Sequence, residues 1–190
     1  MAKGLYTHLR ELWQTHDKEL VKERMIKWRA GGSIVEVEKP LRLDKARSLG
    51  YKAKKGFFVV RVRLIRGGRR RPRHTHGRKS RKQYERKILK MNYQWVAEQR
   101  AEKAYKNLEV LNSYYLAKDG KHYFFEVILV NPEVPEIKND STINWICNPT
   151  NKNRAARGLT SAAKKSRGLR TKSHNMKVRP SARAWSRSGK

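Results

Sequence analysis

The sequence contains one cysteine and few acidic residues. Because Cys147 is the only cysteine among 190 residues, the chain cannot form an internal disulfide or supply a thiolate zinc cluster. Only 16 residues are Asp or Glu, whereas 47 are Lys or Arg, and the formal net charge is +31 at pH 7. So much charge of one sign repels itself in a compact fold, so we expect a polyanionic partner that helps to stabilise the structure.

Long apolar runs are also missing. A transmembrane helix needs about twenty consecutive apolar residues, and the sequence has no such run. The first residues, Met1 to Tyr6, lack the apolar stretch and the small-residue cleavage site of a secretory signal. These absences favour nucleic acid over a membrane surface as the polyanion, and they predict a cytoplasmic protein.

The basic residues gather in two of four segments. Residues 1–38 carry 7 basic and 6 acidic residues, and residues 93–147 carry 6 and 8. Residues 39–92 carry 21 basic and 2 acidic residues, whereas residues 148–190 carry 13 basic residues and no acid. Apolar periodicity also appears in the nearly neutral segments, so these predict the packed core and the basic segments predict the binding surfaces.

Apolar residues recur at helical spacing in three places. The first two sets are Leu5, Leu9, Leu12 and Trp13, and then Val21, Met25 and Trp28. Asp17 is a candidate N-cap for the second helix, and Gly31 and Gly32 end it. The third set is Ala97, Ala101, Ala104 and Leu108. We expect the aromatic residues of the first two helices to pack on the core, and the third helix to pack on a sheet.

Three strands are predicted. Residues 57–65 are rich in aromatic and β-branched residues, with apolar side chains on one face and Arg61 and Arg63 on the other, so this strand is expected to have a basic outer face. Residues 110–116 and 123–130 flank an Asp119-Gly120 turn and predict a β-hairpin. The second hairpin strand places an apolar face inward, consisting of Phe125, Val127 and Leu129.

Together these elements predict an α+β fold in which a small antiparallel sheet packs with helices and carries long basic extensions and loops. We divide the chain into an N-terminal helical segment at residues 1–38, an α+β core at 39–147 with a basic loop at about 66–92, and a basic C-terminal RNA-binding extension at 148–190. Residues 66–84 and 170–190 are expected to be irregular or extended without a partner.

The strongest candidate for phosphate binding is the acid-free stretch at residues 66–82, in which arginine outnumbers lysine. Guanidinium groups bind phosphate with two hydrogen bonds and stack on bases, and the glycines allow close approach to RNA. The alternatives are a solvated loop and a nuclear-import signal. His74 and His76 make a poor metal site because no other ligand is near, so we expect them to contact bases or ribose.

Two further basic stretches are candidates. Residues 157–169 predict a short helix that Thr160 caps and Gly168 ends, and the absence of acids after residue 147 leaves its cations without internal charge partners. Residues 39–56 place Tyr51 among closely spaced cations. Tyr51 either stacks on a base or is an ordinary core residue, and the sequence leaves both interpretations open.

The residues predicted to bind RNA share a positive charge or an imidazole ring within these stretches. They are Arg42, Lys45, Arg47, Lys52, Lys54, Lys55, Arg66, Arg69, Arg70, Arg71, Arg73, His74, His76, Arg78, Lys79, Arg81, Lys82, Arg154, Arg157, Lys164, Lys165, Arg167 and Arg170. No cofactor, metal, membrane or small-molecule substrate is expected.

Two other classes of protein were considered. An RNA-processing enzyme would need paired acids, a nucleotide-binding glycine fingerprint or a nucleophile with its base, and we find none, since Asp44, Asp119 and Asp140 are scattered and Asp119 is explained by its turn. A chromatin-type DNA-binding protein would share the charge and its salt dependence. Arginines and aromatic residues on loops suit irregular RNA better than a regular DNA groove.

Several stretches resemble one family of ribosomal proteins. They are RLDKARSLGYKAK at residues 42–54, RGGRRRP at 66–72, LNSY at 111–114 with FEVIL at 125–129, and RGLTSA at 157–162. In this order they closely resemble the fifteen-e family of large-subunit ribosomal proteins from archaea and eukaryotes.

The resemblance implies a non-enzymatic structural constituent of the cytoplasmic ribosome, with large-subunit rRNA and neighbouring ribosomal proteins as partners. It also implies a small α+β domain with extensions threaded among RNA helices, and we expect an archaeal source. One departure is Ala163, which stands where the family usually has glycine. If that glycine contacts the RNA backbone, the added methyl group would loosen the local fit.

Overall fold

The structure is a computed structural model that describes residues 3–15, 18–72, 77 and 86–170. Its helices are α1 (Leu5–Gln14), α2 (Lys18–Ala30), α3 (Leu43–Ser48), α4 (Tyr93–Ala104), α5 (Pro135–Lys138) and α6 (Ser161–Ser166), with short 3-10 helices η2 (Asn144–Cys147) and η3 (Pro149–Asn151). Its strands are β1 (Ile34–Val37), β2 (Phe57–Ile65), β3 (Arg69–Arg70), β4 (Arg86–Lys87), β5 (Glu109–Lys118) and β6 (His122–Val130).

The main sheet is antiparallel, with strand order β1-β2-β6-β5. The predicted strand and hairpin are confirmed, and β2 pairs with β6 from Phe57 opposite Val130 to Ile65 opposite His122. Asp119 closes the hairpin as expected, because its carboxylate accepts hydrogen bonds from the backbone N–H groups of Lys121 and His122. The predicted α+β class is therefore correct.

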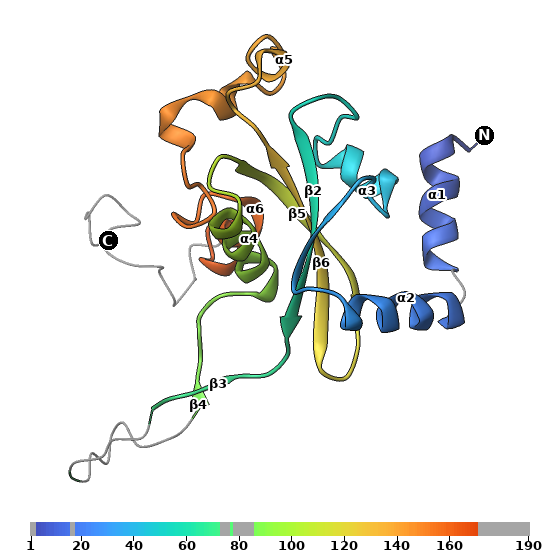
Figure 1. Ribbon diagram of the computed structural model, residues 1–190, viewed down its shortest axis with the longest axis vertical. Coiled ribbons are helices and arrows are strands. Elements are labelled where there is room, and N and C mark those ends of the chain that lie inside the picture. The colour runs from blue at the N-terminus through green and yellow to red at the C-terminus, as the bar shows by residue number, and fades with distance from the viewer. Residues whose placement is uncertain (1–2, 16–17, 73–76, 78–85, 171–190) are drawn as a thin grey trace.

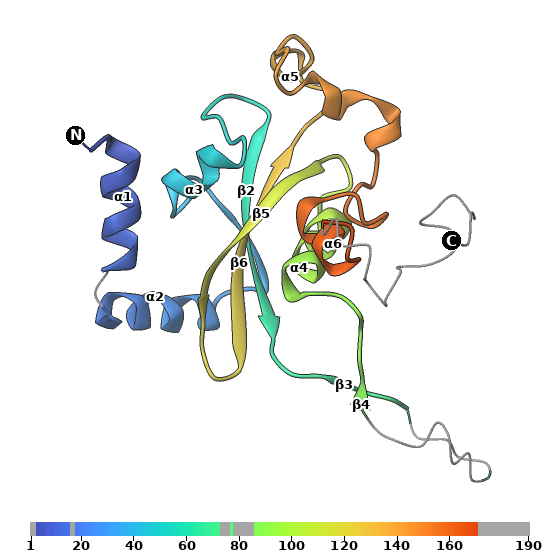
Figure 2. The same cartoon turned by 180° about the vertical axis from the view of Figure 1, so that it is seen from behind.

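Helices cover both faces of this sheet, as Figures 1 and 2 show from opposite sides. On one face α4 packs over Val62, Val127 and other apolar residues of β2 and β6. On the other face Trp28 of α2, which is 8% exposed, packs on Phe124. The expected basic outer face of residues 57–65 is therefore wrong.

Arg61 and Arg63 are half-buried beneath α2. The Arg61 guanidinium lies 5.0 Å from the centre of a Trp28 ring, and Arg63 donates hydrogen bonds to the carbonyl groups of Trp28 and Arg29. Sequence alternation suggested one solvated face, but a strand that is covered on both sides can bury arginine stems where the charged ends find aromatic rings and carbonyl oxygens.

The predicted helices are present, with differences at their ends and on their faces. α2 ends at Ala30, before the two glycines, and the candidate cap Asp17 lies outside the described residues. Leu5 and Leu12 of α1 are both 65% exposed although they share an apolar face. The prediction that Leu108 belongs to the third helix is wrong, because α4 ends at Ala104 and a turn returns Leu108 to the same core.

Two basic parts leave or return to this core. The basic arm, residues 66–92, leaves the end of β2 and returns to α4, and β3 pairs with β4 near its base (Figure 1). The C-terminal segment, residues 149–170, packs back against α4 and β5 through α6. The division of the chain at residues 38 and 147 stays a prediction. In the described part of the chain, no helix is long and apolar enough to cross a membrane.

Candidate RNA interface

Buried glutamates of α4 and β5 hold the C-terminal segment against the core. We call Glu98, Glu102 and Glu109 the acid cluster. The two Glu102 carboxylate oxygens accept hydrogen bonds from the backbone N–H groups of Ala155 and Ala156, at 2.9 and 2.7 Å. Glu109 accepts one from the N–H group of Asn153 at 3.0 Å. The acid cluster thus satisfies backbone donors of a turn that has no regular secondary structure partner.

Arg154 supplies the positive charge opposite the acid cluster. It is half-buried and donates to the carbonyl oxygens of Val110 and Leu111 at 2.7 and 2.9 Å. Burial lowers the pKa of Arg154, and the nearby charges of Glu98, Glu109 and Glu102 oppose this lowering. The acid-free C-terminus supplies no acidic partner of its own, and the acids near Arg154 lie far upstream in α4 and β5.

Glu98 links the acid cluster to the start of α6. Its carboxylate is fully buried and accepts hydrogen bonds from the hydroxyl groups of Ser113 and Thr160. Burial raises the pKa of Glu98, although both hydrogen bonds oppose the rise. Thr160 also caps α6 as predicted, since its side chain accepts from the N–H group of Ala163, and Gly168 follows the helix with a positive φ of 71°.

α6 packs on α4 through small side chains. Ala162 and Ala163 contact Trp95, whose indole N–H donates to the carbonyl of Ala155 at 2.7 Å. Ala163 is 0% exposed. The methyl group that distinguishes this chain from the resembled family therefore points into the protein, and it fills space against Trp95.

The outward side of the C-terminal segment carries exposed cations. Arg157, Lys164, Lys165 and Arg170 are exposed, whereas Arg167 is half-buried and donates to the carbonyl of Gly158 at 2.9 Å. Lys164 and Lys165 lie in the last turn of α6. The predicted RNA-binding residues of this segment thus divide into outward cations and cations that stabilise the fold.

The base of the arm lies beside α6. The backbone N–H of Asn92 donates to the Ser166 hydroxyl at 3.0 Å, and that hydroxyl donates to the carbonyl of Lys90 at 3.1 Å. The Asn92 amide also donates to the carbonyl of Ala162 at 2.9 Å. These bonds bring the two strongly basic tracts of the sequence together at one end of α4.

In the described part of the arm, Arg69 and Arg70 are exposed and Arg71 is half-buried. Arg66 donates to the carbonyl of Asp119 and lies 5.0 Å from the centre of the Tyr123 ring. The remaining predicted residues of the arm lie outside the described residues, namely Arg73, His74, His76, Arg78, Lys79, Arg81 and Lys82. The exposed Lys87 and Lys90 were not predicted, because they follow Glu85 and lie outside the acid-free stretch.

Residues 39–56 form a third basic surface, on the α1–α3 side of the sheet (Figure 2). Lys52 and Lys54 donate to the Asp140 carboxylate at 2.7 and 2.6 Å, and these bonds hold the pKa of Asp140 well below its usual range. Tyr51 is half-buried, and its ring meets the Phe57 ring edge-on at 5.9 Å, which favours the core interpretation.

The other predicted residues of this surface differ in exposure. Lys45, Arg47 and Lys55 are exposed, and Arg47 contacts the Tyr6 ring. Arg42 is half-buried, where it lies 4.9 Å from the centre of a Trp13 ring and pairs with Asp44 at 3.3 Å. The exposed cations are therefore the members of this surface that remain available to a phosphate.

The structure also bears on the enzyme alternative. Sequence analysis found no paired acids, but α4 brings Glu98 and Glu102 together one helical turn apart. Their oxygens are occupied by Ser113, Thr160 and backbone N–H groups, so they are not poised to act on a substrate. In the described ranges, no group of three or more His, Cys, Asp or Glu residues is arranged to hold a metal ion.

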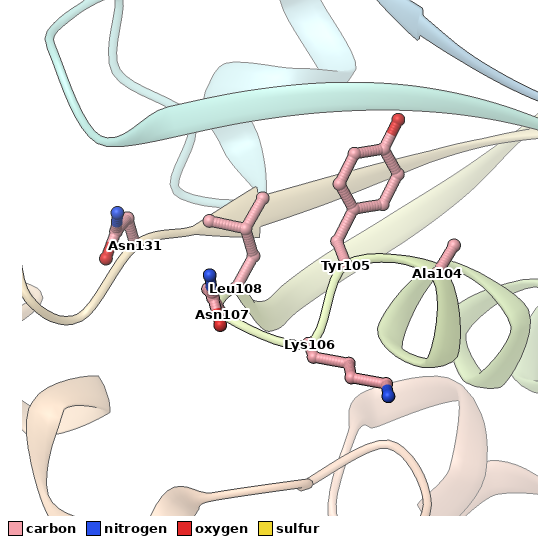
Figure 3. Close-up of a pocket in the computed structure, with 6 residues that line it drawn as sticks. All are labelled: Ala104, Tyr105, Lys106, Asn107, Leu108 and Asn131. Atoms are coloured by element: carbon pink, nitrogen blue, oxygen red, sulfur yellow. The ribbon is translucent and has the colours of Figure 1, made fainter.

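A hollow of about 520 Å³ lies at the turn between α4 and β5. Its lining consists of Ala104, Tyr105, Lys106, Asn107, Leu108 and Asn131, which include no carboxylate, imidazole or thiol. Figure 3 shows that Tyr105 and Leu108 point toward the sheet while Lys106 points away from it. The titratable side chains of its lining are those of Tyr105 and Lys106.

Comparisons with known proteins bear on the family of this chain. Residues 4–185 match the protein family described as Ribosomal L15. The large ribosomal subunit protein eL15 of Methanospirillum hungatei is 48% identical to this chain over an alignment of length 190 that covers 97% of each chain. A family match across nearly the whole chain, together with a relative this similar, shows that the chain belongs to the ribosomal L15 family.

Proposed function

We propose that this protein is a structural constituent of the large subunit of the cytoplasmic ribosome and that it binds large-subunit rRNA. The basic arm, the outward cations of the C-terminal segment and those of residues 39–56 make the phosphate contacts. Neighbouring ribosomal proteins are further partners. Family membership supports the ribosomal assignment, and the Methanospirillum relative supports an archaeal source.

One observation supports RNA binding most directly. The fold uses its buried acids to hold Arg154 and the backbone at residues 153–156, while Arg157, Lys164 and Lys165 stay exposed. α6 lies beside Lys90 and Asn92 at the base of the arm, and Arg69 and Arg70 are exposed further along the arm on β3. A surface of this charge, held against the core, suits the irregular backbone of folded RNA.

Binding of the full chain to large-subunit rRNA at a series of KCl concentrations tests the proposal. If about ten phosphates are neutralised, the slope of log affinity against log salt is expected to be about −7 to −9. A flat salt response contradicts the proposal. In cell extracts, the protein should sediment with large subunits at low salt and be released at high salt.

The same titration with duplex DNA at equal phosphate concentration tests the DNA-binding alternative. We expect tighter binding to folded RNA, because arginines on loops adapt to unpaired and distorted regions that a regular duplex lacks. Equal affinities for the two nucleic acids would favour a general polyanion-binding protein.

A further inference from the structure

Aromatic rings follow one another from the base of the arm across the sheet. The Tyr93 and Tyr123 ring centres are 4.7 Å apart, and the Tyr115 ring lies 6.4 Å from Tyr123 and 5.9 Å from Phe125. Tyr93 and Tyr123 are half-buried and Phe125 is 5% exposed, whereas Tyr115 is 41% exposed. The row therefore ends in one aromatic side chain that is supported from beneath and open to solvent.

The position of α4 explains why Tyr115 is open. The Gln94 side chain, in the first turn of α4, donates to both the carbonyl and the hydroxyl of Ser113. Tyr115 lies two residues further along β5, which is an edge strand, so it faces the same side of the sheet beyond the N-terminal end of α4. Tyr115 stays 41% exposed there, although α6 also contacts β5.

The basic tracts flank this open aromatic side chain. On the arm side, the Tyr93 hydroxyl accepts a hydrogen bond from the N–H of Gly67 at 2.8 Å and donates one to its carbonyl at 3.1 Å. On the other side, the contacts of Asn92 with Ser166 and Ala162 hold α6, with its exposed Lys164 and Lys165, at the start of α4. Arg66 lies over Tyr123 between them.

We propose that Tyr115 is a stacking platform for an unpaired base of large-subunit rRNA, whose flanking phosphates are bound by cations of α6 and of the described part of the arm. This inference rests on the proposed function and assigns a base contact within it. A base presents a flat face whatever its sequence, and a supported tyrosine ring offers a matching surface at small entropic cost. An apolar protein side chain is a poorer occupant, because its approach would desolvate the surrounding cations without supplying an anion.

The test uses variants of the full chain at position 115. We expect Tyr115→Ala to weaken binding to large-subunit rRNA by about tenfold at every salt concentration, with an unchanged salt slope, because stacking neutralises no phosphate. Tyr115→Phe should bind within about twofold of the unchanged chain, since it keeps the ring. Leu12→Ala, which shortens an exposed apolar side chain on α1, is the control, and the melting temperature of each variant reports its folding.

Two outcomes would overturn the inference. If Tyr115→Ala binds rRNA as tightly as the unchanged chain, Tyr115 contacts no base. If Tyr115→Leu restores the affinity that Tyr115→Ala loses, the contact is general apolar packing of the kind a protein partner would make. Ultraviolet cross-linking of the rRNA complex should also give a nucleotide adduct on the peptide that contains Tyr115. Failure of the proposed function is distinguishable, because the unchanged chain would then bind rRNA without salt dependence.

Discussion

The basic arm and the C-terminal segment are both rich in Lys and Arg, but they are attached to the core differently. The C-terminal segment is held by the acid cluster, by the Trp95 indole N–H and by the packing of Ala162 and Ala163. The described part of the arm is attached to the core at its base, where Gly67 makes two bonds with Tyr93, and β3 pairs with β4 within the arm itself. A basic tract is therefore packed on the core where buried acids of another segment bind it.

The same difference separates individual cations within the C-terminal segment. Arg154 and Arg157 are three residues apart, yet Arg154 lies against the acid cluster while Arg157 is exposed and donates only to the carbonyl of Thr150 among its described hydrogen bonds. The depth of a guanidinium relative to the acid cluster, rather than its place in a basic stretch, decides whether it stabilises the fold or is free to bind phosphate.

Replacement of Arg154 should have the largest effect. Arg154→Ala leaves the acid cluster without its cation and the carbonyls of Val110 and Leu111 without their donor. We expect the free energy of unfolding to fall by about 3 kcal/mol, as when one partner of a buried ion pair is removed. Urea unfolding of the isolated protein, followed by tryptophan fluorescence, measures this change.

Arg157→Ala is the matched control for that variant. Because Arg157 is exposed, its removal should change the free energy of unfolding by less than about 0.5 kcal/mol while it weakens rRNA binding. If both variants unfold alike, the distinction between the buried and the outward cation is wrong.

Removal of outward charge tests whether the two tracts bind RNA equally. One double variant combines Arg69→Gln and Arg70→Gln, and the other combines Lys164→Gln and Lys165→Gln. All four side chains are exposed. Each double variant should reduce the salt slope by about 1.5 and the affinity at low salt by about tenfold, because two phosphate contacts are lost.

The packing of the mutated residues should distinguish these double variants by their heat of binding. Arg69 and Arg70 lie on β3, which pairs with β4 of the arm, whereas α6 packs on α4 of the core. Ordering on RNA should therefore cost more at β3 than at α6, and we expect the arm variant to lose the more favourable enthalpy of binding. Equal calorimetric changes for the two variants would show that the difference in attachment has no consequence for binding.

Local patterns in the sequence were sufficient for most of the fold. Alternation and turn chemistry placed β2 and the β5–β6 hairpin, because the alternation within a strand and the Asp119 turn depend on residues that are close in the chain. Apolar spacing placed α1, α2 and α4. The alternation of residues 57–65 gave the wrong environment for Arg61 and Arg63, because it cannot show that α2 covers their face of the sheet.

The arrangement of the site depends on contacts between distant residues, so much of it could not be predicted. The predicted roles of Thr160 and Gly168 at the two ends of α6 were correct, because helix capping depends on residues that are close in the chain. The pairing of Glu102 with residues 155 and 156 spans more than fifty positions, and no local pattern marks it. Charge counting therefore placed Arg154 with the RNA-binding residues, although its described contacts lie inside the protein.

Ala163→Gly tests how closely α6 must fit α4. The change removes a methyl group that is fully buried against Trp95 and places glycine within a helix, so we expect the free energy of unfolding to fall by about 1 kcal/mol. Affinity for rRNA should change little, because the methyl group has no exposed surface. Ala156→Gly, at an exposed position outside the helix, is the control, and a tighter rRNA complex for Ala163→Gly would contradict this assignment.

The smallest effect is expected on the third basic surface, where an acid near the protein surface holds the cations. Lys52 and Lys54 lower the pKa of Asp140, so its carboxylate stabilises the fold above its unfolded pKa of about 4 and loses that contribution as the pH falls further. Asp140→Asn should lower the free energy of unfolding at pH 7, and its difference from the unchanged chain should shrink below about pH 4. Urea unfolding at pH 7, 5 and 3.5 measures this trend, with Glu136→Gln as a control that removes an exposed carboxylate. If the difference stays constant down to pH 3.5, the charge of Asp140 does not hold residues 39–56 against the core. Stabilisation of a basic segment by acidic residues is then limited to the acid cluster.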